Sequence, residues 1–110
     1  MKYVMFVATD PEPGSREGAM DIEDWISDVA GSKRLIGDRL RPVSDATTIR
    51  VRSDELLVTD GPFTESKEWI VGFDILECDD LDEAIEIASK HPVARSGRIE
   101  IRPFWDGTDD

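Results

Sequence analysis

Asp60 is the residue whose neighbours best suit acid-base chemistry. It opens the segment Asp60-Gly61-Pro62-Phe63 directly after an aliphatic stretch, and loops at strand ends are where functional groups are commonly presented. A carboxylate can act as a general base when burial raises its pKa toward the working pH. The structural alternative is a turn, because an Asp before Gly-Pro accepts hydrogen bonds from backbone amides. Asp60 is therefore a candidate catalytic residue, and the two roles can coexist.

Two arginines and an acid in an apolar stretch are candidates for binding a ligand. Arg50 and Arg52 are two residues apart, so on a strand both project from one face, where they would either orient an anionic group or form a solvated edge. Asp74 lies among apolar residues, where an unpaired carboxylate is costly. Either this strand face is in contact with water, or Asp74 pairs with an arginine of residues 47–52, or it lines a small-molecule cavity. Gly72 leaves room for a ligand or a neighbouring backbone, unless it marks a bulge.

The single histidine and the single cysteine offer weaker chemistry. His91 is a weaker catalytic candidate, since its place at the end of a predicted helix also suits a partial positive charge beside the helix dipole. Cys78 has acidic neighbours that would raise the pKa of its thiol, which favours an inert small residue over a nucleophile. The sequence shows no Gly-rich phosphate loop, no Ser/His/Asp arrangement and no metal-ligand spacing. We therefore expect neither a cofactor nor a metal ion.

Hydrophobic patterns predict the elements that must position these residues. Alternation with period two predicts strands, and apolar residues three and four apart predict helices. The first helix should end at Gly31, and the second should begin at a capping box in which Asp80 accepts from the Glu83 amide while Glu83 reaches back to the cap amide. Ser53-Asp54 is a turn of hairpin length. The predicted strands are 2–8, 35–40, 47–52, 55–59, 69–78 and 98–102, and the predicted helices are 20–30 and 81–91.

This order of elements predicts an α+β fold. Two strand-helix-strand halves that share one antiparallel sheet, with both helices on one face, form a ferredoxin-like protomer, here with an inserted β-hairpin. Two helices cover only one face of the sheet, so the second apolar face needs another cover. A homodimer that packs sheet face on sheet face, a dimeric α+β barrel, is the economical solution because two-fold pairing is the commonest form of oligomer.

The composition describes one acidic domain. The 110 residues include 25 acidic and 13 basic side chains, a net charge of −12, which argues against a nucleic-acid partner because such proteins need a basic surface. The first apolar run, residues 3–8, is too short for a signal sequence or a membrane span, so we expect a cytoplasmic protein without membrane contact. Residues 31–60 have six basic and five acidic groups, and an anion site is expected there. The acidic tail, residues 106–110, is expected to fray.

A series of motifs extends along nearly the whole chain. The series consists of Val58-Thr59-Asp60-Gly61-Pro62-Phe63, Glu65, Lys67 and Glu68, Gly72-Phe73, Asp79-Asp80-Leu81-Asp82-Glu83-Ala84, and Ile99-Glu100-Ile101-Arg102-Pro103. In this series the chain resembles the YCII-related family, specifically its DGPF-domain branch. The resemblance runs from residue 2 to residue 105, and it implies one such domain over residues 1–110.

The resemblance also implies an assembly and a site. It implies a dimeric α+β barrel of ferredoxin-like protomers in a bacterial, cytoplasmic family whose members mostly lack an assigned reaction. Some relatives are joined to, or sit beside, sigma factors of the extracytoplasmic type. In the wider group a His and Asp pair in a cleft has been proposed as an acid-base site. Asp60 matches the acidic position, but this chain has no histidine in its first helical region, so the pair is half missing there.

Two functions follow as hypotheses. The first is a dimer that binds, and can process by acid-base chemistry, a small organic molecule, with Asp60 as the candidate base and Arg50 or Arg52 orienting an anionic group of that molecule. The second is a non-catalytic regulatory or interaction module that contacts a protein partner, with a sigma factor as the partner that the resemblance suggests. A net charge of −12 suits contact with a basic protein. A deep polar pocket would favour the first hypothesis.

Overall fold

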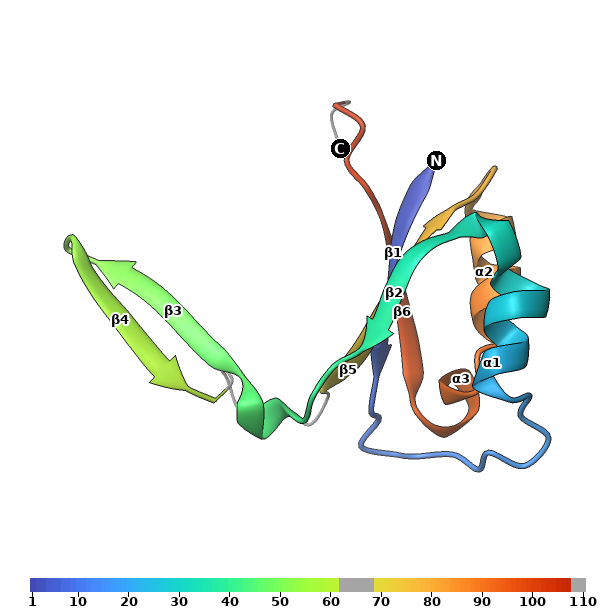
Figure 1. Ribbon diagram of the computed structural model, residues 1–110, viewed down its shortest axis with the longest axis horizontal. Coiled ribbons are helices and arrows are strands. Elements are labelled where there is room, and N and C mark those ends of the chain that lie inside the picture. The colour runs from blue at the N-terminus through green and yellow to red at the C-terminus, as the bar shows by residue number, and fades with distance from the viewer. Residues whose placement is uncertain (62–68, 108–110) are drawn as a thin grey trace.

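The computed structural model describes residues 1–61 and 69–107 and contains one four-stranded sheet, a separate hairpin and short helices (Figure 1). The sheet is antiparallel with the strand order β2-β5-β1-β6. Its strands are β1 (Lys2–Ala8), β2 (Arg34–Arg39), β5 (Ile70–Glu77) and β6 (Arg98–Pro103), and the hairpin strands are β3 (Thr47–Arg52) and β4 (Glu55–Asp60).

β1 lies in the middle of the sheet, as its continuous apolar run predicts. It pairs with β5 on one side and with β6 on the other, and β5 in turn pairs with β2. Strands that alternate across such a sheet place every second side chain on one face. Tyr3, Met5 and Val7 of β1 therefore share a face with Leu76 of β5, because Tyr3 is the register partner of Leu76.

The first helical segment begins with α1 (Ile22–Asp24) and continues as a π-helical turn (Trp25–Ala30) and a 3₁₀ turn (Gly31–Lys33). Asp21 caps its start by accepting a hydrogen bond from the Glu23 amide at 2.8 Å. The π-helical turn ends at Gly31, which has φ 51° and donates from its amide to the Ile26 carbonyl. A positive φ favours glycine, so the predicted helix end at Gly31 is confirmed.

The second helix, α2 (Leu81–Ser89), begins at the predicted cap. The Asp80 carboxylate accepts from the Glu83 amide at 2.9 Å, as in a capping box. The other half of the box is different, because the Glu83 carboxylate accepts from the Asp79 amide at 3.0 Å and not from the cap amide. A short helix, α3 (Val93–Ser96), follows before β6.

The helices pack on one face of the sheet, where the core lies (Figure 1). Trp25 is fully buried, and its indole N–H donates to the Ile87 carbonyl of α2 at 2.8 Å, which ties the first helical segment to the second. The buried residues that form the core are Tyr3, Met5, Val7, Trp25, Ala30, Leu76, Cys78, Ala84, Ile87 and Ala88. Burial raises the pKa of the Cys78 thiol, which agrees with the inert role expected for it.

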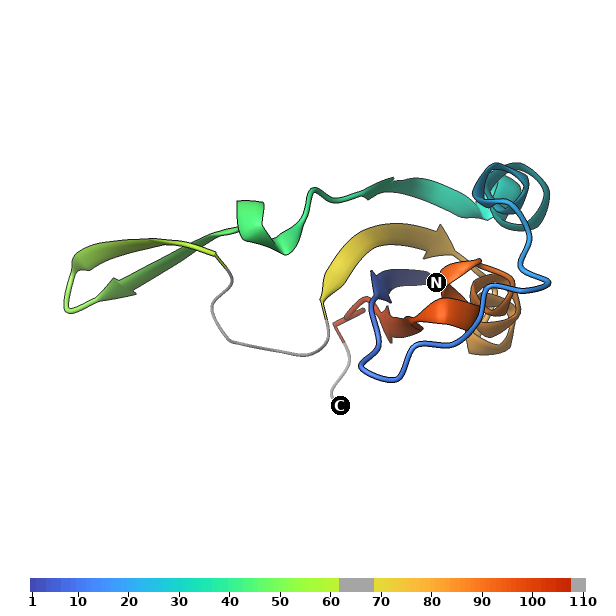
Figure 2. The same ribbon diagram turned by 90° about the horizontal axis from the view of Figure 1, so that it is seen from below.

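The hairpin β3–β4 extends away from the sheet and the helices (Figures 1 and 2). Ser53 and Asp54 form its turn with φ of 52° and 64°, the two positive values that a tight type I′ hairpin turn requires. The predicted hairpin is therefore confirmed, with β4 one residue longer than expected. In the described part of the chain, no helix is long and apolar enough to cross a membrane.

The α+β class, the four-stranded antiparallel sheet and the separate hairpin are all confirmed. Pairing of two sheets in a dimer stays a prediction. Several sequence features lie outside the described residues, namely Pro62, Phe63, Glu65, Lys67 and Glu68, and residues 108–110 of the acidic tail.

Candidate functional site

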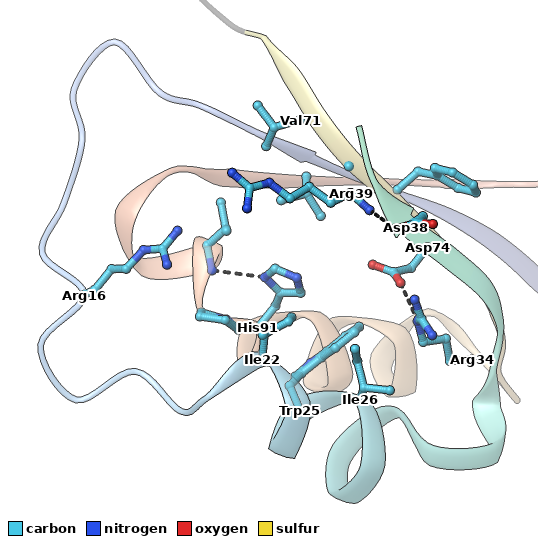
Figure 3. Close-up of a pocket in the computed structure, with 15 residues that line it drawn as sticks. Arg16, Ile22, Trp25, Ile26, Arg34, Asp38, Arg39, Val71, Asp74 and His91 are labelled. Atoms are coloured by element: carbon cyan, nitrogen blue, oxygen red, sulfur yellow. Dashed lines mark hydrogen bonds and ion pairs between the residues drawn. The ribbon is translucent and has the colours of Figure 1, made fainter. Parts of the chain in front are cut away.

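A cavity of about 520 Å³ opens between the sheet and the first helical segment. Its apolar wall includes Trp25 and Ile26 from the π-helical turn and Val7 from β1. Its polar wall gathers residues from the loop after β1, from β2, from β5 and from the segment after α2 (Figure 3). These polar residues are Arg16, Arg34, Asp38, Arg39, Asp74 and His91.

Asp74 forms the most buried ion pair of the cavity. Only 5% of Asp74 is exposed, and its Oδ1 accepts from the Arg34 Nε at 2.6 Å. Burial raises the pKa of the Asp74 carboxyl, and the hydrogen bond from Arg34 opposes that rise. In Figure 3 the second carboxylate oxygen points toward the side of the cavity where His91 lies. The expected partner of Asp74, an arginine of residues 47–52, is therefore wrong, because those residues lie on the hairpin while β2 is the strand beside β5.

Gly37 makes room for this ion pair. It is the register partner of Asp74 across the β2–β5 pairing. A Cβ on Gly37 would overlap the Asp74 Oδ1, and it would come within 2.8 Å of an Arg34 side-chain nitrogen. Any side chain at this position would thus displace the carboxylate or the guanidinium, so the absence of a Cβ at residue 37 is a condition for the pair.

His91 is buried and neutral at the opposite side of the cavity. It is 5% exposed, and its ring meets the Trp25 ring edge-on with the centroids 4.7 Å apart. Its Nδ1 accepts from the Val93 amide at 3.0 Å, so the neutral ring carries its proton on Nε2. Burial, with a smaller contribution from the Arg16 charge, lowers the pKa of His91 to about 4. The expected role as a positively charged helix end is therefore wrong, because α2 ends at Ser89 and the imidazole packs inside the fold.

Arg16 and Arg39 supply positive charge near His91. In Figure 3 both side chains lie on the His91 side of the cavity, whereas Arg34 lies beyond Asp74. Arg16 donates from its Nε to the Ser96 hydroxyl at 3.1 Å. Arg39 forms no ion pair with any residue in the ranges 1–61 and 69–107. The cavity has three arginines and two aspartates in a chain of net charge −12, so it is more positive than the rest of the protein.

The sequence-predicted site residues divide into two groups. Gly72, Asp74 and His91 line the cavity. Asp60, Arg50 and Arg52 lie on the hairpin strands and do not line it. At Gly72 a Cβ would lie 3.1 Å from the Asp38 carbonyl oxygen. Gly72 therefore leaves room for the neighbouring backbone of β2, which is one of the alternatives expected for it. The β1–β5 register also shifts next to its partner Val7, which agrees with the alternative of a bulge.

Besides Arg16 and Asp38, the polar cavity residues that sequence reasoning did not propose as site residues include Arg34 and Arg39 of β2. They are five positions apart, and simple alternation would place them on opposite faces of β2. A register shift between Arg34 and Ile36 brings both arginines to the same face of β2. Arg34 therefore pairs with Leu76, and Arg39 pairs with Gly72, on the cavity face. The only sequence signal was the positive balance of residues 31–60. Within the described ranges, no three His, Cys, Asp or Glu side chains gather closely enough to hold a metal ion.

Comparison with known proteins identifies the family. Residues 1–107 match the YCII-related domain. The chain belongs to the YCII-related domain family. A curated relative, an uncharacterised protein of Rhizobium meliloti (strain 1021), is 42% identical over 68 residues, which covers 60% of this chain and 55% of the relative. The match thus spans little more than half the length of that relative, and neither comparison names a reaction. For this YCII-related protein the cavity is the best guide to function.

Proposed function

We propose that this YCII-related protein binds a small organic anion in the cavity and transfers a proton to or from it. The observation that carries the proposal is the convergence of Arg39, Asp74 and His91, which come from β2, from β5 and from the segment after α2. A volume of about 520 Å³ is within the range of small-molecule sites, about 300–1,000 Å³.

The charges and walls of the cavity define the ligand class. Arg39 has a guanidinium that no described residue neutralises, and such a group binds carboxylates and phosphates with two parallel hydrogen bonds. The opposite wall, with Trp25, Ile26 and Val7, is apolar. A carboxylate or phosphate on a small apolar or aromatic body satisfies both walls, because the anion meets Arg39 while the body is removed from water.

Asp74 and His91 divide the acid-base work in this proposal. The acid-base role that the sequence favoured for Asp60 is proposed for Asp74, since Asp74 is the carboxylate in the cavity and burial raises its pKa toward neutrality. The neutral His91 ring cannot easily accept a proton, because its Nδ1 already accepts from Val93. Its Nε2–H donates instead to the ligand oxygen on which negative charge develops.

The scaffold and the family resemblance support the same site. The sheet order and the helices on one face agree with the ferredoxin-like protomer that the sequence predicted. For the wider group the resemblance implies a His and Asp pair in a cleft, and the sequence indicated that this pair is half missing here, with Asp60 at the acidic position and no histidine in the first helical region. In this chain His91 and Asp74 are a histidine and an aspartate that line one cavity, although the histidine follows the second helix and not the first.

Thermal unfolding with a panel of small acids tests the binding proposal. Benzoate, phenylacetate, phenylpyruvate and phenyl phosphate serve as probes, and benzamide is the uncharged control. A ligand that binds only the folded state at 100 times its Kd stabilises the protein by about 2.7 kcal/mol, which raises the Tm of a chain of this size by roughly 10 °C or more. At least one acid should raise the Tm, and benzamide should not.

Arg39→Gln and Arg41→Gln separate the cavity from general charge effects. Both remove one positive charge, but Arg41 is exposed and pairs with Asp45 outside the cavity. In Arg39→Gln the Kd of the best acid should rise at least about tenfold, consistent with the loss of a charge-assisted hydrogen bond, and the Tm shift should shrink accordingly. In Arg41→Gln the Tm shift should persist. Equal shifts in the two variants, or no shift with any acid, would contradict the proposal.

An interaction function is the second candidate, and the exposed acidic start of α2 is the observation that favours it. Asp79, Asp80 and Asp82 are exposed there, and Glu86 is exposed one turn further along the helix. Such a surface suits a basic protein partner, with a sigma factor as the partner that the resemblance suggests. Binding of a sigma factor that survives Arg39→Gln but is lost in a double variant, Asp82→Lys with Glu86→Lys, would favour this candidate over the cavity.

A further inference from the structure

Two of the three arginines that line the cavity have no carboxylate partner. Arg34 pairs with Asp74 at 2.6 Å, so these two charges neutralise each other. Arg16 donates from its Nε to the hydroxyl of Ser96, which is uncharged. Within residues 1–61 and 69–107, neither Arg16 nor Arg39 forms an ion pair. Two positive charges are therefore left for a ligand.

The carboxylate of Asp38 does not neutralise these arginines, because it lies on the other face of the sheet. Asp38 is the register partner of Phe73, and Arg39 is the register partner of Gly72. Gly72 in turn pairs with Val7 of the core, so alternation places Arg39 on the cavity face and Asp38 on the face without helices. The Asp38 Oδ1 accepts from the Arg39 amide at 2.7 Å. The backbone of Asp38 thus borders the cavity while its charge points away.

The loop that carries Arg16 is fixed to the helix α3. The Gly14 amide donates to the Ser96 carbonyl at 3.2 Å, and Arg95 donates from its side chain to the Glu17 carbonyl at 3.1 Å. A Cβ on Gly14 would overlap the Arg95 carbonyl oxygen, so glycine is what allows the loop to lie this close. With the bond from Arg16 to Ser96, these contacts hold the guanidinium in place before a ligand arrives, which lowers the entropic cost of binding.

One further acid shares a hollow with Arg16. Asp21 and Arg16 both line a second hollow that borders the cavity at Ile22 and Pro92. The Asp21 Oδ1 accepts from the Glu23 amide at 2.8 Å at the start of the first helical segment. In the described part of the chain Asp21 forms no ion pair. Asp21 therefore caps the helix and leaves the Arg16 charge unneutralised.

Arg16 and Arg39 form the rim of the cavity, above a buried floor. Both arginines are exposed, whereas Asp74 and His91 are each 5% exposed. In Figure 3 both guanidiniums lie on the His91 side of the cavity. The Arg16 charge also contributes to the lowered pKa of His91, which agrees with a guanidinium that faces the cavity. A ligand that reaches the floor passes both arginines.

We infer that the cavity selects a small organic ligand with two negative charges, one bound by Arg39 and the other by Arg16. Each guanidinium can form two parallel hydrogen bonds with a carboxylate or a phosphate. Two negative charges neutralise both arginines, whereas a monoanion leaves one of them without a partner. The inference rests on the proposed function, since it concerns the ligand of the same cavity, and it makes Arg16 a residue that determines specificity.

Two pairs of probes test the number of charges. Phenylmalonate has one carboxylate more than phenylacetate, and phenyl phosphate has one charge more than methyl phenyl phosphate at pH 7.5, because the second pKa of a phosphate monoester is about 6. In isothermal titration calorimetry, at least one dianion should bind at least about tenfold tighter than its monoanion. The pair with the larger difference tells whether the ligand carries its charges on two carboxylates or on one phosphate. Equal affinities within both pairs would overturn the inference.

Arg16→Gln and Arg95→Gln test whether Arg16 reads the second charge. Both variants remove one positive charge and one contact between the loop and α3, but Arg95 does not line the cavity. The preference for the dianion should disappear in Arg16→Gln and persist in Arg95→Gln. A preference that survives Arg16→Gln, or that both variants lose equally, would overturn the inference.

Failure of this inference differs from failure of the proposed function. If monoanions and dianions bind equally well and Arg39→Gln weakens both, the proposed function stands and the role of Arg16 is refuted. If none of the four probes binds to the wild-type protein, both are refuted.

NMR of the arginine side chains tests the inference in the wild-type protein. The Nε–H signals can be assigned by their loss in Arg16→Gln, Arg39→Gln and Arg95→Gln. Saturation with the tighter dianion should shift the Arg16 and Arg39 signals and leave the Arg95 signal in place. An Arg16 signal that does not move at saturation would overturn the inference.

Discussion

Lowering the pH from 7.5 to 5 should destabilise the wild-type protein by about 2 kcal/mol more than a His91→Asn variant. His91 is buried, and its pKa in the folded protein is about 4, compared with an ordinary value of 6.5. The unfolded chain therefore binds a proton on His91 as the pH falls through 6.5, whereas the folded protein does not until about pH 4. Stability falls across this window because protons bind preferentially to the unfolded state.

The magnitude follows from the two pKa values. Each pH unit between them costs about 1.4 kcal/mol, so the full effect approaches about 3 kcal/mol below pH 4, and about 2 kcal/mol is reached at pH 5. Asn is the variant of choice because its side-chain oxygen can still accept from the Val93 amide, as the His91 Nδ1 does at 3.0 Å. Loss of the ring next to Trp25 lowers the stability of the variant at every pH, and this constant offset cancels in the comparison between pH values.

The assay is urea unfolding of both proteins at pH 7.5, 6.5, 5.5 and 5. Because His91 is the single histidine of the chain, its ring protons can also be followed directly by NMR titration of the folded protein. The midpoint should lie near pH 4. A midpoint near 6.5, or a pH dependence of unfolding that is the same in wild type and variant, would refute the buried and neutral state on which the proposed role of His91 depends.

Three further predictions concern the residues that hold the cavity in shape. Arg34→Met should cost about 3–5 kcal/mol at pH 8, because it leaves Asp74 buried without its partner. In urea unfolding this cost should shrink as the pH falls and Asp74 takes up a proton, and a cost independent of pH would argue against a charged Asp74. Gly37→Ala should cost about 1–3 kcal/mol in the same assay, because the new Cβ overlaps the Asp74 carboxylate, and a neutral result would contradict this contact. Trp25→Phe should cost about 1–2 kcal/mol, since it removes the indole donor to the Ile87 carbonyl, and thermal unfolding that matches the wild type would contradict that bond.

Local signals predicted most of the elements. Ser53-Asp54 indicated a hairpin turn, Gly31 a helix end and Asp80 a helix start, and the structure has each of these features. Such signals are readable because turn and cap geometry depends on residues within about four positions of one another. Asp74 was also recognisable as an acid on an apolar face, and it is buried.

The partners of the site residues were not predictable in the same way. Asp74 pairs with Arg34, which is 40 positions away, and the pairing depends on a strand order that local patterns do not encode. The shift of register in β2 places both Arg34 and Arg39 on the cavity face, against the alternation that the sequence suggests. For His91 the local pattern indicated a helix end, but Trp25 of the first helical segment buries the ring.

The sequence by itself determined the α+β class, the hairpin, the capped second helix and the presence of an acidic residue whose pKa burial would change. These depend on the order of apolar and polar residues and on turn chemistry, both of which act between near neighbours. Only the tertiary structure decided which charges meet in the cavity. It also decided that Asp60, Arg50 and Arg52 lie on the separate hairpin β3–β4. The physical reason is that strand pairing and helix packing bring together residues tens of positions apart, and one shifted register changes which side chains face a cavity.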